Sequence, residues 1–161
     1  MTAPLIVISR CDPEHPDARQ LVEELSATLA GITGDSGKAS FAPDDARVLR
    51  SLFVVARDVH GQLLGCGALR PLEGEGANDG ETIAELKRMY ARPGTQGVGA
   101  ALLDYLECSA REFGYARLWL ETRRVNARAV EFYVRHGYAP IANFGKYVGR
   151  ADAICLGKAL A

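Results

Sequence analysis

The chain has 161 residues, a length that suits one domain with a buried core. Hydrophobic residues make up 48% and charged residues 24%, which excludes intrinsic disorder as the main state. The 19 basic and 20 acidic residues leave a formal charge of -1, which argues against a dedicated nucleic-acid-binding protein.

The first part of the chain combines short β-rich runs with one amphipathic helix. Residues 5–9 (LIVIS) favour a strand. Residues 18–30 carry apolar side chains on one helical face, and Gly31 is the expected C-cap. A polar, glycine-rich loop follows over residues 31–40, and the segment 44–52 reads as a second, shorter helix.

Three strand-like segments come next, over residues 52–57, 62–69 and 82–90. Their connections are short and rich in turn residues, and one of them is a Gly/Glu/Asn loop over residues 73–80. Because short connections join antiparallel neighbours, the three segments predict a meander.

The last part of the chain contains two helices and three strands. A glycine loop over residues 92–99 precedes the first helix, and Asn126 caps the second, which stops at Gly137. The helices are expected over residues 100–113 and 126–136, and the strands over 117–122, 138–143 and 153–159.

The strand–helix–strand unit over residues 82–122 requires a right-handed crossover and a parallel strand pair, whereas the other connections favour antiparallel pairing. The fold class is therefore α/β, with a mixed, mostly antiparallel central sheet of six to seven strands and helices on both faces. We expect one domain over residues 1–161, because no linker or repeat divides the chain.

The sequence shows no membrane, secretion or metal signal. No apolar run approaches the ~18–20 residues of a membrane span, and no basic segment precedes the first apolar stretch. The four cysteines lack CxxC spacing and are expected to be free thiols in a reducing cytoplasm. No His/Cys/Asp cluster has the spacing of metal ligands, so we expect no metal site.

The glycine loop between a strand and a helix is suited to an anion. Its glycines let the backbone approach a ligand, and the amides of residues 98–101 lie at the positive end of the helix. A dinucleotide fingerprint is one alternative, with Gly97 and Gly99 as its first glycines and Glu121 as the ribose-binding acid. Leu102 occupies the position of its third glycine, which disfavours that reading.

Two motifs in order resemble the GCN5-related N-acetyltransferase (GNAT) superfamily. Residues 84–103 contain A-E-L-K-R-M-Y-A-R-P and then Q-G-V-G-A-A-L-L, and residues 126–138 read N-A-R-A-V-E-F-Y-V-R-H-G-Y. The resemblance implies the acyl-CoA N-acyltransferase fold and a glycine loop that binds the pyrophosphate of acetyl-CoA. It also implies acetyl transfer from acetyl-CoA to a primary amine by direct attack, with no acyl-enzyme.

The loop departs from the family pattern in length, because the stretch from Pro93 to Gly99 is two residues short. The pattern can begin at Gln96, or it can end on residues 97–99; we favour the first register. The resemblance then assigns cofactor binding to strand amides, loop amides and a helix cap: Met89, Tyr90, Ala91, Gln96, Gly97, Val98, Gly99, Ala100, Ala101 and Asn126. A strand bulge near residues 89–91 is implied as well, with an oxyanion-binding amide.

The resemblance assigns the general base to Glu85, acting through a water, and the general acid to Tyr133. Strand alternation predicts Glu85, Lys87 and Met89 on one face, where partial burial would make the glutamate a better base. The hydroxyl of Tyr133 can protonate the leaving thiolate. The structural alternatives are an ion-paired glutamate and a core tyrosine.

The acceptor side is expected near Phe144 and Tyr147, which either wall the pocket or plug the end of the sheet. The expected acceptor is an amine of a small molecule or a peptide. No nucleic acid or membrane partner is expected, and the resemblance is compatible with a homodimer. A non-catalytic acyl-CoA-binding regulatory module on the same fold is the alternative that the shortened loop leaves open.

Overall fold

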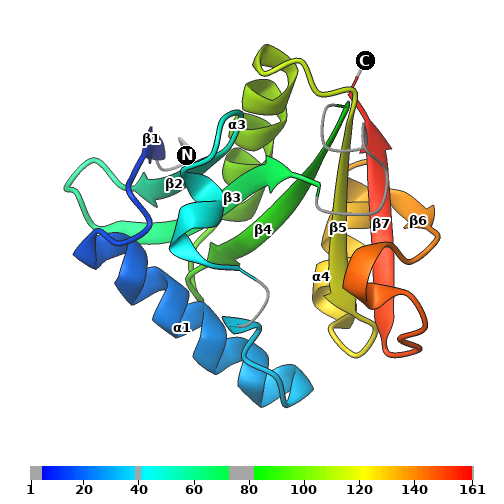
Figure 1. Ribbon diagram of the computed structural model, residues 1–161. Helices are drawn as coiled ribbons and strands as arrows, with labels where there is room; N and C mark the ends of the chain where they lie inside the picture. The colour runs from blue at the N-terminus through cyan, green and yellow to red at the C-terminus, as the bar shows by residue number, and fades with distance from the viewer. Residues whose placement is uncertain (1–4, 39–40, 73–81, 161) are drawn as a thin grey trace.

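The computed structural model describes residues 5–38, 41–72 and 82–160, and within them seven strands form one sheet in the order β1-β2-β3-β4-β5-β7-β6 (Figure 1). The strands are β1 (Val7–Arg10), β2 (Leu52–Arg57), β3 (Leu63–Pro71), β4 (Ile83–Ala91), β5 (Arg117–Arg123), β6 (Ala139–Ile141) and β7 (Ala153–Ala159). The helices are α1 (Pro16–Thr33), α3 (Val98–Glu112) and α4 (Ala127–Arg135), with 3-10 turns η2 (Pro43–Ala46) and η3 (Gly145–Tyr147). The loop expected over residues 73–80 lies outside the described residues.

The sheet is mixed, as the sequence predicts. β4 and β5 pair in parallel across the α3 crossover, and the other neighbouring strands pair antiparallel. β7 lies between β5 and β6, so β6 forms an edge of the sheet. None of the described helices has the length and hydropathy of a membrane-spanning segment.

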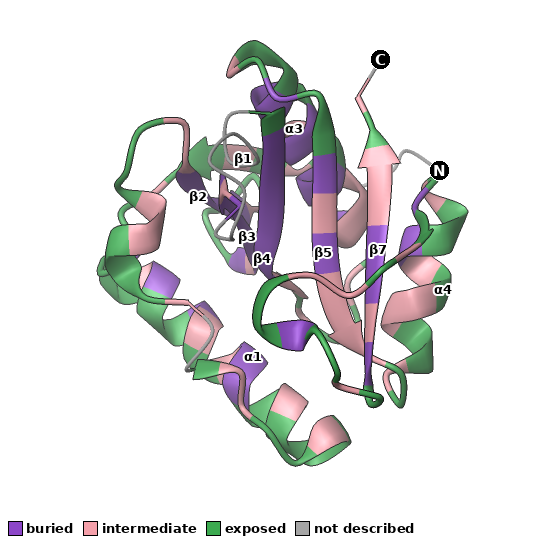
Figure 2. Ribbon diagram, turned by 45° about the vertical axis from the view of Figure 1, so that its right-hand side comes forward, coloured by how far each residue is buried: buried purple, intermediate pink, exposed green. Residues whose placement is uncertain are grey.

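Helices cover both faces of the sheet. α3 and α4 bury one face, where Leu102 and Leu106 are fully enclosed with the central strands. α1 covers the opposite face, where Leu21 packs on Phe53. Each such side chain contributes about 1.5–3 kcal/mol by leaving water. Figure 2 shows the resulting buried stretch along β4, in the middle of the sheet.

A β-bulge interrupts β4 at Arg88, which has a φ of 55°. The register between β3 and β4 shifts at this point, so the alternation of side chains resets. Met89 therefore turns toward α3, where its sulfur would lie 2.7 Å from a Cβ at Gly67. This corrects the expectation that Met89 shares a face with Glu85 and Lys87.

Beyond the first three residues of β4, the sheet opens. β4 pairs with β5 only over Ile83, Ala84 and Glu85, and the second halves of the two strands diverge (Figure 1). The bulge and the divergence coincide, as the family resemblance implies for this region. The opening leaves the β5-facing edge of the second half of β4 without a partner strand in the described part of the sheet.

The bounds of α1 differ from the sequence expectation. The helix continues through Gly31 and ends at Gly34, whose φ of 79° is left-handed. Gly34 donates its amide to the carbonyl of Ala30, which satisfies an otherwise free acceptor at the helix end. Gly31 is exposed, and a Cβ there would meet nothing within 4 Å, so no contact requires a glycine at this position.

Two other elements are shorter than expected. The helix predicted over residues 44–52 is only the turn η2, in which the carboxylate of Asp45 accepts from the amide of Ala42. The strand predicted over residues 138–143 is reduced to β6, and beyond it the side-chain amide of Asn143 donates to the carbonyls of Tyr147 and Arg150 in the following loop.

Candidate active site

A cleft of about 270 Å³ fills the opening between β4 and β5. Its walls come from both faces of the sheet: Asn126, Ala129 and Tyr133 of α4 lie on one side, and Leu29 and Thr33 of α1 lie on the other. The cleft therefore runs through the sheet, so that two ligands entering from opposite faces could meet inside it.

Tyr133 forms part of the cleft wall and is 8% exposed. Its ring packs edge-to-face against Phe132 and Tyr138, with centroids 5.1 and 5.6 Å apart. No hydrogen-bond partner for its hydroxyl occurs among the described residues, and burial alone raises the pKa of Tyr133 above its ordinary value of 10.0. The phenol therefore stays protonated at neutral pH and is available as a donor.

Asn126 caps α4 and also lines the cleft. Its side-chain oxygen accepts from the amide of Ala129 at 3.3 Å, which confirms the helix start that the sequence predicts. The same residue belongs to the cleft wall. A ligand in the cleft therefore lies beside the N-terminal turn of α4.

The glycine loop ends in a left-handed residue, Gly97, with a φ of 74°, and α3 begins directly after it. The amide of Ala101 donates to the carbonyl of Gly97 at 3.0 Å. The amides free to bind an anion are consequently those of Val98, Gly99 and Ala100, one fewer than expected. A Cβ on Gly99 would lie 3.3 Å from the Phe132 ring, so the N-terminus of α3 lies against α4.

An ion pair between distant parts of the chain holds the start of the glycine loop. Arg92 donates to both carboxylate oxygens of Glu24 on α1, at 2.9 and 2.8 Å, and to the carbonyl of Leu63. The hydrogen bonds from Arg92 are the main reason that the pKa of Glu24 is lowered. The sequence gives no local signal for this contact, because 68 residues separate its partners.

Glu85 is buried, with 3% exposure, and lies between two cations. Its carboxylate contacts Nη2 of Arg70 at 3.1 Å and Nζ of Lys87 at 3.3 Å. It does not line the cleft but a neighbouring hollow of about 340 Å³, and the two spaces share the side chain of Tyr147 as a wall. Glu85 is thus a paired carboxylate one side chain away from the cleft.

The two aromatic residues expected on the acceptor side lie together at this boundary. Tyr147 is 3% exposed, and its hydroxyl accepts from Nζ of Lys87 at 2.9 Å. Burial lowers the pKa of Lys87 and raises that of Tyr147. Phe144 lines the hollow and packs on Tyr147 and Trp119, with ring centroids 5.5 and 5.2 Å apart.

Glu121 is an acid of the cleft that the sequence analysis considered only as a ribose ligand. It lines the cleft, its side chain is 9% exposed, and burial raises its pKa. The signal was present in the alternation of β5, which places Trp119, Glu121 and Arg123 on one face. Trp119 is the register partner of Glu85 in the parallel β4–β5 pair, so Glu85 lies beside this same face of β5.

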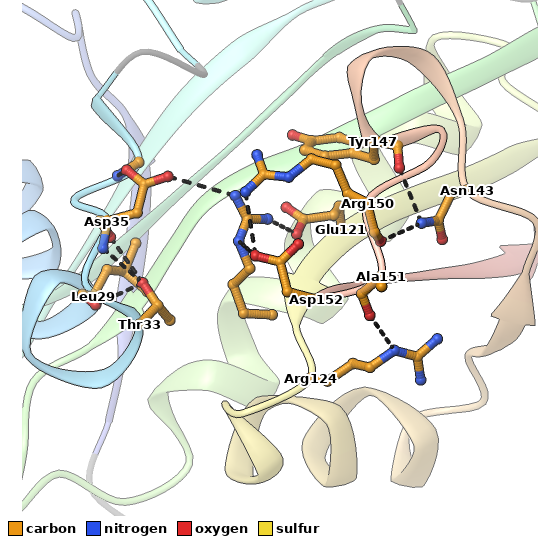
Figure 3. A network of polar contacts seen from close by, with 12 residues as sticks. Leu29, Thr33, Asp35, Glu121, Arg124, Asn143, Tyr147, Arg150, Ala151 and Asp152 are labelled. Carbon is orange, nitrogen blue, oxygen red and sulfur yellow. Dashed lines mark hydrogen bonds and ion pairs between the residues drawn. The ribbon is translucent and has the colours of Figure 1, made fainter.

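Arg123 joins Glu121 to a network across the cleft mouth. It forms an ion pair with Glu121 and lies 3.5 Å from Asp35 and 3.6 Å from Asp152. Figure 3 shows Asp35, from the loop after α1, on one side of this network and Glu121, Arg150 and Asp152 on the other. The network therefore connects the α1 loop with β5 and the segment before β7.

Comparison with known proteins agrees with this architecture. The sequence model of the Acetyltransferase (GNAT) family matches residues 18–138. An IAA acetyltransferase of Azospirillum brasilense is 32% identical over 151 residues, which cover 89% of this chain and 91% of that protein.

Solved structures show the same fold. A proposed acyl-CoA N-acyltransferase of Klebsiella pneumoniae superposes with a TM-score of 0.78 and 25% identity, covering 98% of this chain and 99% of that one. An aminoglycoside 6'-N-acetyltransferase complexed with coenzyme A has a TM-score of 0.64 and 18% identity, covering 96% and 97%. The chain belongs to the GNAT acetyltransferase family and has its acyl-CoA N-acyltransferase fold.

Proposed function

We propose that the protein is an acetyl-CoA-dependent N-acetyltransferase that acts on a primary amine of a small molecule or peptide. The observation that carries this proposal is the cleft through the sheet, with the unpaired phenol of Tyr133 in its wall. The family supplies the reaction class, and the buried phenol in the cleft wall supports the assignment of Tyr133 as the donor that protonates the leaving thiolate.

The residues around the cleft fit an acyl-CoA. The amides of residues 98–100 and the positive end of α3 can hold its pyrophosphate. The open edge of β4 beyond Glu85 offers the backbone groups of Met89, Tyr90 and Ala91 to the pantetheine arm, as an added strand would use them. Asn126 then lies on the α4 side of the arm.

The reaction needs one bond exchange and two proton transfers. The amine nitrogen attacks the thioester carbonyl carbon, the new C–N bond forms, and the C–S bond breaks. The ammonium proton leaves to a base, and the hydroxyl of Tyr133 protonates the departing sulfur, so the products are an amide and the coenzyme A thiol. We assign the stabilisation of the oxyanion to a backbone amide next to the bulge at Arg88.

We assign the base to Glu85, acting through a water in the hollow that Glu85 shares with Tyr147. Ion pairs to Arg70 and Lys87 keep its carboxylate in position beside that space. Glu121 is the competing candidate, because it lines the cleft itself and its pKa is raised by burial. Phe144 and Tyr147 form the acceptor wall in either case.

The relatives differ in the acceptor that their names give. One is the IAA acetyltransferase above; another is the [ribosomal protein bS18]-alanine N-acetyltransferase of Escherichia coli, 37% identical over 70 residues, which cover 38% of this chain and 44% of that protein. Both a small molecule and a protein N-terminus are therefore compatible with this family.

The proposed function is tested by the release of coenzyme A thiol from acetyl-CoA in the presence of a panel of primary amines. We expect release that depends on both the protein and the amine. Calorimetric titration with acetyl-CoA is run in parallel. The shortened glycine loop favours one second candidate, a regulatory module, and acetyl-CoA binding without turnover of any amine would support that module instead.

A further inference from the structure

The cleft is basic although the chain as a whole has a formal charge of -1. Of its described lining residues, five are basic and two are acidic. The basic residues are Lys87, Arg88, Arg123, Lys146 and Arg150, and the acidic ones are Asp35 and Glu121. A cleft lined mainly by one sign of charge focuses its field and concentrates ligands of the opposite sign.

Three of the five basic side chains have protein carboxylates as partners. Lys87 pairs with Glu85 at 3.3 Å. Arg123 and Arg150 pair with Asp152 at 3.6 and 3.3 Å. For the other two, Arg88 and Lys146, no carboxylate lies within ion-pair distance in the part of the chain that the structure describes. These two are the candidates for holding a ligand anion.

Arg88 is a buried cation with incomplete hydrogen bonding. It is 8% exposed, and its terminal nitrogens donate to the carbonyl oxygens of Ser36 and Gly37. Its Nε is buried and has no partner among the described residues. Burial lowers the pKa of Arg88, because desolvation disfavours the charged form. A bound anion would offset the cost of this buried charge.

Lys146 approaches the same region from a different element. It is exposed on the turn η3, and its ammonium lies 5.6 Å from the ring centroid of Tyr147. Lys146 and Tyr147 line both the cleft and the neighbouring hollow. Arg88 on β4 and Lys146 on η3 therefore present two cations to one cleft, next to the expected acceptor wall.

We propose that the acceptor amine carries an anionic group, a carboxylate or a phosphate, which binds to Arg88 and Lys146 in the cleft. The proposal rests on the N-acetyltransferase function above, because it describes the substrate of that site. A purely cationic acceptor such as a polyamine is repelled by the same charges. Acetylation neutralises the amine and leaves the anionic group unchanged, so both side chains contact acceptor and product alike.

The first test compares acceptors in matched pairs. L-amino acids are compared with their amides, and phosphoethanolamine with ethanolamine, by kcat/KM from thiol release. One charge-assisted contact predicts an advantage of about 10- to 100-fold for the anionic member. The two sets of pairs distinguish a carboxylate from a phosphate. Equal or faster turnover of the neutral members would overturn the proposal.

A binding measurement separates this proposal from the proposed function. N-acetylated amino acids and their amides are titrated into the wild-type protein by calorimetry, without any turnover. Tighter binding of the N-acetylated acids than of their amides supports the anion site. If no amine is acetylated, that absence of turnover rejects only the proposed function. Equal binding of acid and amide would reject the anion site.

A variant of the exposed partner tests the assignment. Lys146→Gln is expected to raise the KM of the anionic acceptor about tenfold more than that of the neutral acceptor, and Lys146→Arg restores the KM. Arg111→Gln removes an exposed charge at the end of α3 and serves as the control. An equal loss with both acceptors, or a raised KM for acetyl-CoA, would contradict the assignment.

Discussion

At the scale of single residues, the proposed acid Tyr133 is the simplest to test, because it lines the cleft and burial raises its pKa above 10.0. Tyr133→Phe removes the proton donor and keeps the ring packing. We expect kcat to fall about 100- to 10,000-fold with the Kd of acetyl-CoA unchanged.

Tyr115→Phe is the matched control, because the hydroxyl of Tyr115 is also partly buried but donates to the carbonyl of Arg50. The raised pKa keeps Tyr133 protonated, so this group imposes no decline in wild-type kcat as pH rises to about 10. Full activity of Tyr133→Phe would show that another group protonates the thiolate.

The identity of the base is decided by comparing Glu85→Gln with Glu121→Gln. We expect Glu85→Gln to lower kcat about 100-fold or more per folded molecule, and Glu121→Gln to have a smaller effect. The opposite order would transfer the role to Glu121. In that case the raised pKa of Glu121 predicts an acidic limb in the wild-type pH–rate profile that lies above the ordinary range of a glutamate and disappears in the variant.

A control for folding is needed, because Glu85→Gln removes a buried carboxylate that pairs with Lys87 and with Arg70, although Arg70 keeps its contact with Asp45 at 2.8 Å. Breaking a buried pair costs about 3–5 kcal/mol of the free energy of unfolding. Glu107→Gln is matched: Glu107 is 6% exposed and pairs with Lys158 at 3.0 Å, but it does not line the cleft. Comparable destabilisation of this variant with normal kcat would separate folding from catalysis.

At the scale of elements, alanine substitutions at Gly97 and at Gly31 are expected to change the free energy of unfolding in opposite directions. A Cβ meets nothing within 4 Å at either Gly97 or Gly31. Gly97 has a φ of 74°, so Gly97→Ala costs about 1–2 kcal/mol of the free energy of unfolding through the backbone alone. Gly31 lies inside α1, so Gly31→Ala adds about 0.5–1 kcal/mol. Denaturant unfolding of both variants checks the signs.

The elements show where sequence reasoning works and where it stops. The parallel β4–β5 pair follows from a crossover that the chain must make, and the face of α3 follows from its apolar spacing. Met89 was placed on the wrong face, because strand alternation assumes a regular strand and the bulge at Arg88 breaks it. The resemblance implies a bulge near residues 89–91, but strand alternation alone does not show its position at Arg88.

In the candidate site, residues of local motifs were predictable from the sequence, whereas contacts between distant residues were not. The positions of Tyr133 and Asn126 on α4 follow from a local motif of one helix, and their proposed roles stay predictions. The Glu24–Arg92 pair and the approach of Arg88 to the loop after α1 depend on contacts across 68 and 51 residues, for which the sequence has no pattern. The basic character of the cleft was hidden for the same reason, since the overall composition is nearly neutral.

At the scale of the whole molecule, the proposed function depends on the opening between β4 and β5 in the described sheet. The cleft reaches the α3–α4 face, where free amides and Tyr133 lie, and the α1 face, where the basic side chains lie. This arrangement separates the proposed acyl-CoA side from the proposed acceptor side, and the two meet between β4 and β5.

A crystal structure of the protein with acetyl-CoA tests this central claim most directly. The account predicts the pyrophosphate at the amides of residues 98–100, the pantetheine arm along the open edge of β4, and the thioester sulfur within hydrogen-bond distance of the Tyr133 hydroxyl. Acetyl-CoA bound outside the β4–β5 cleft, or inside it with the sulfur remote from Tyr133, would contradict the account.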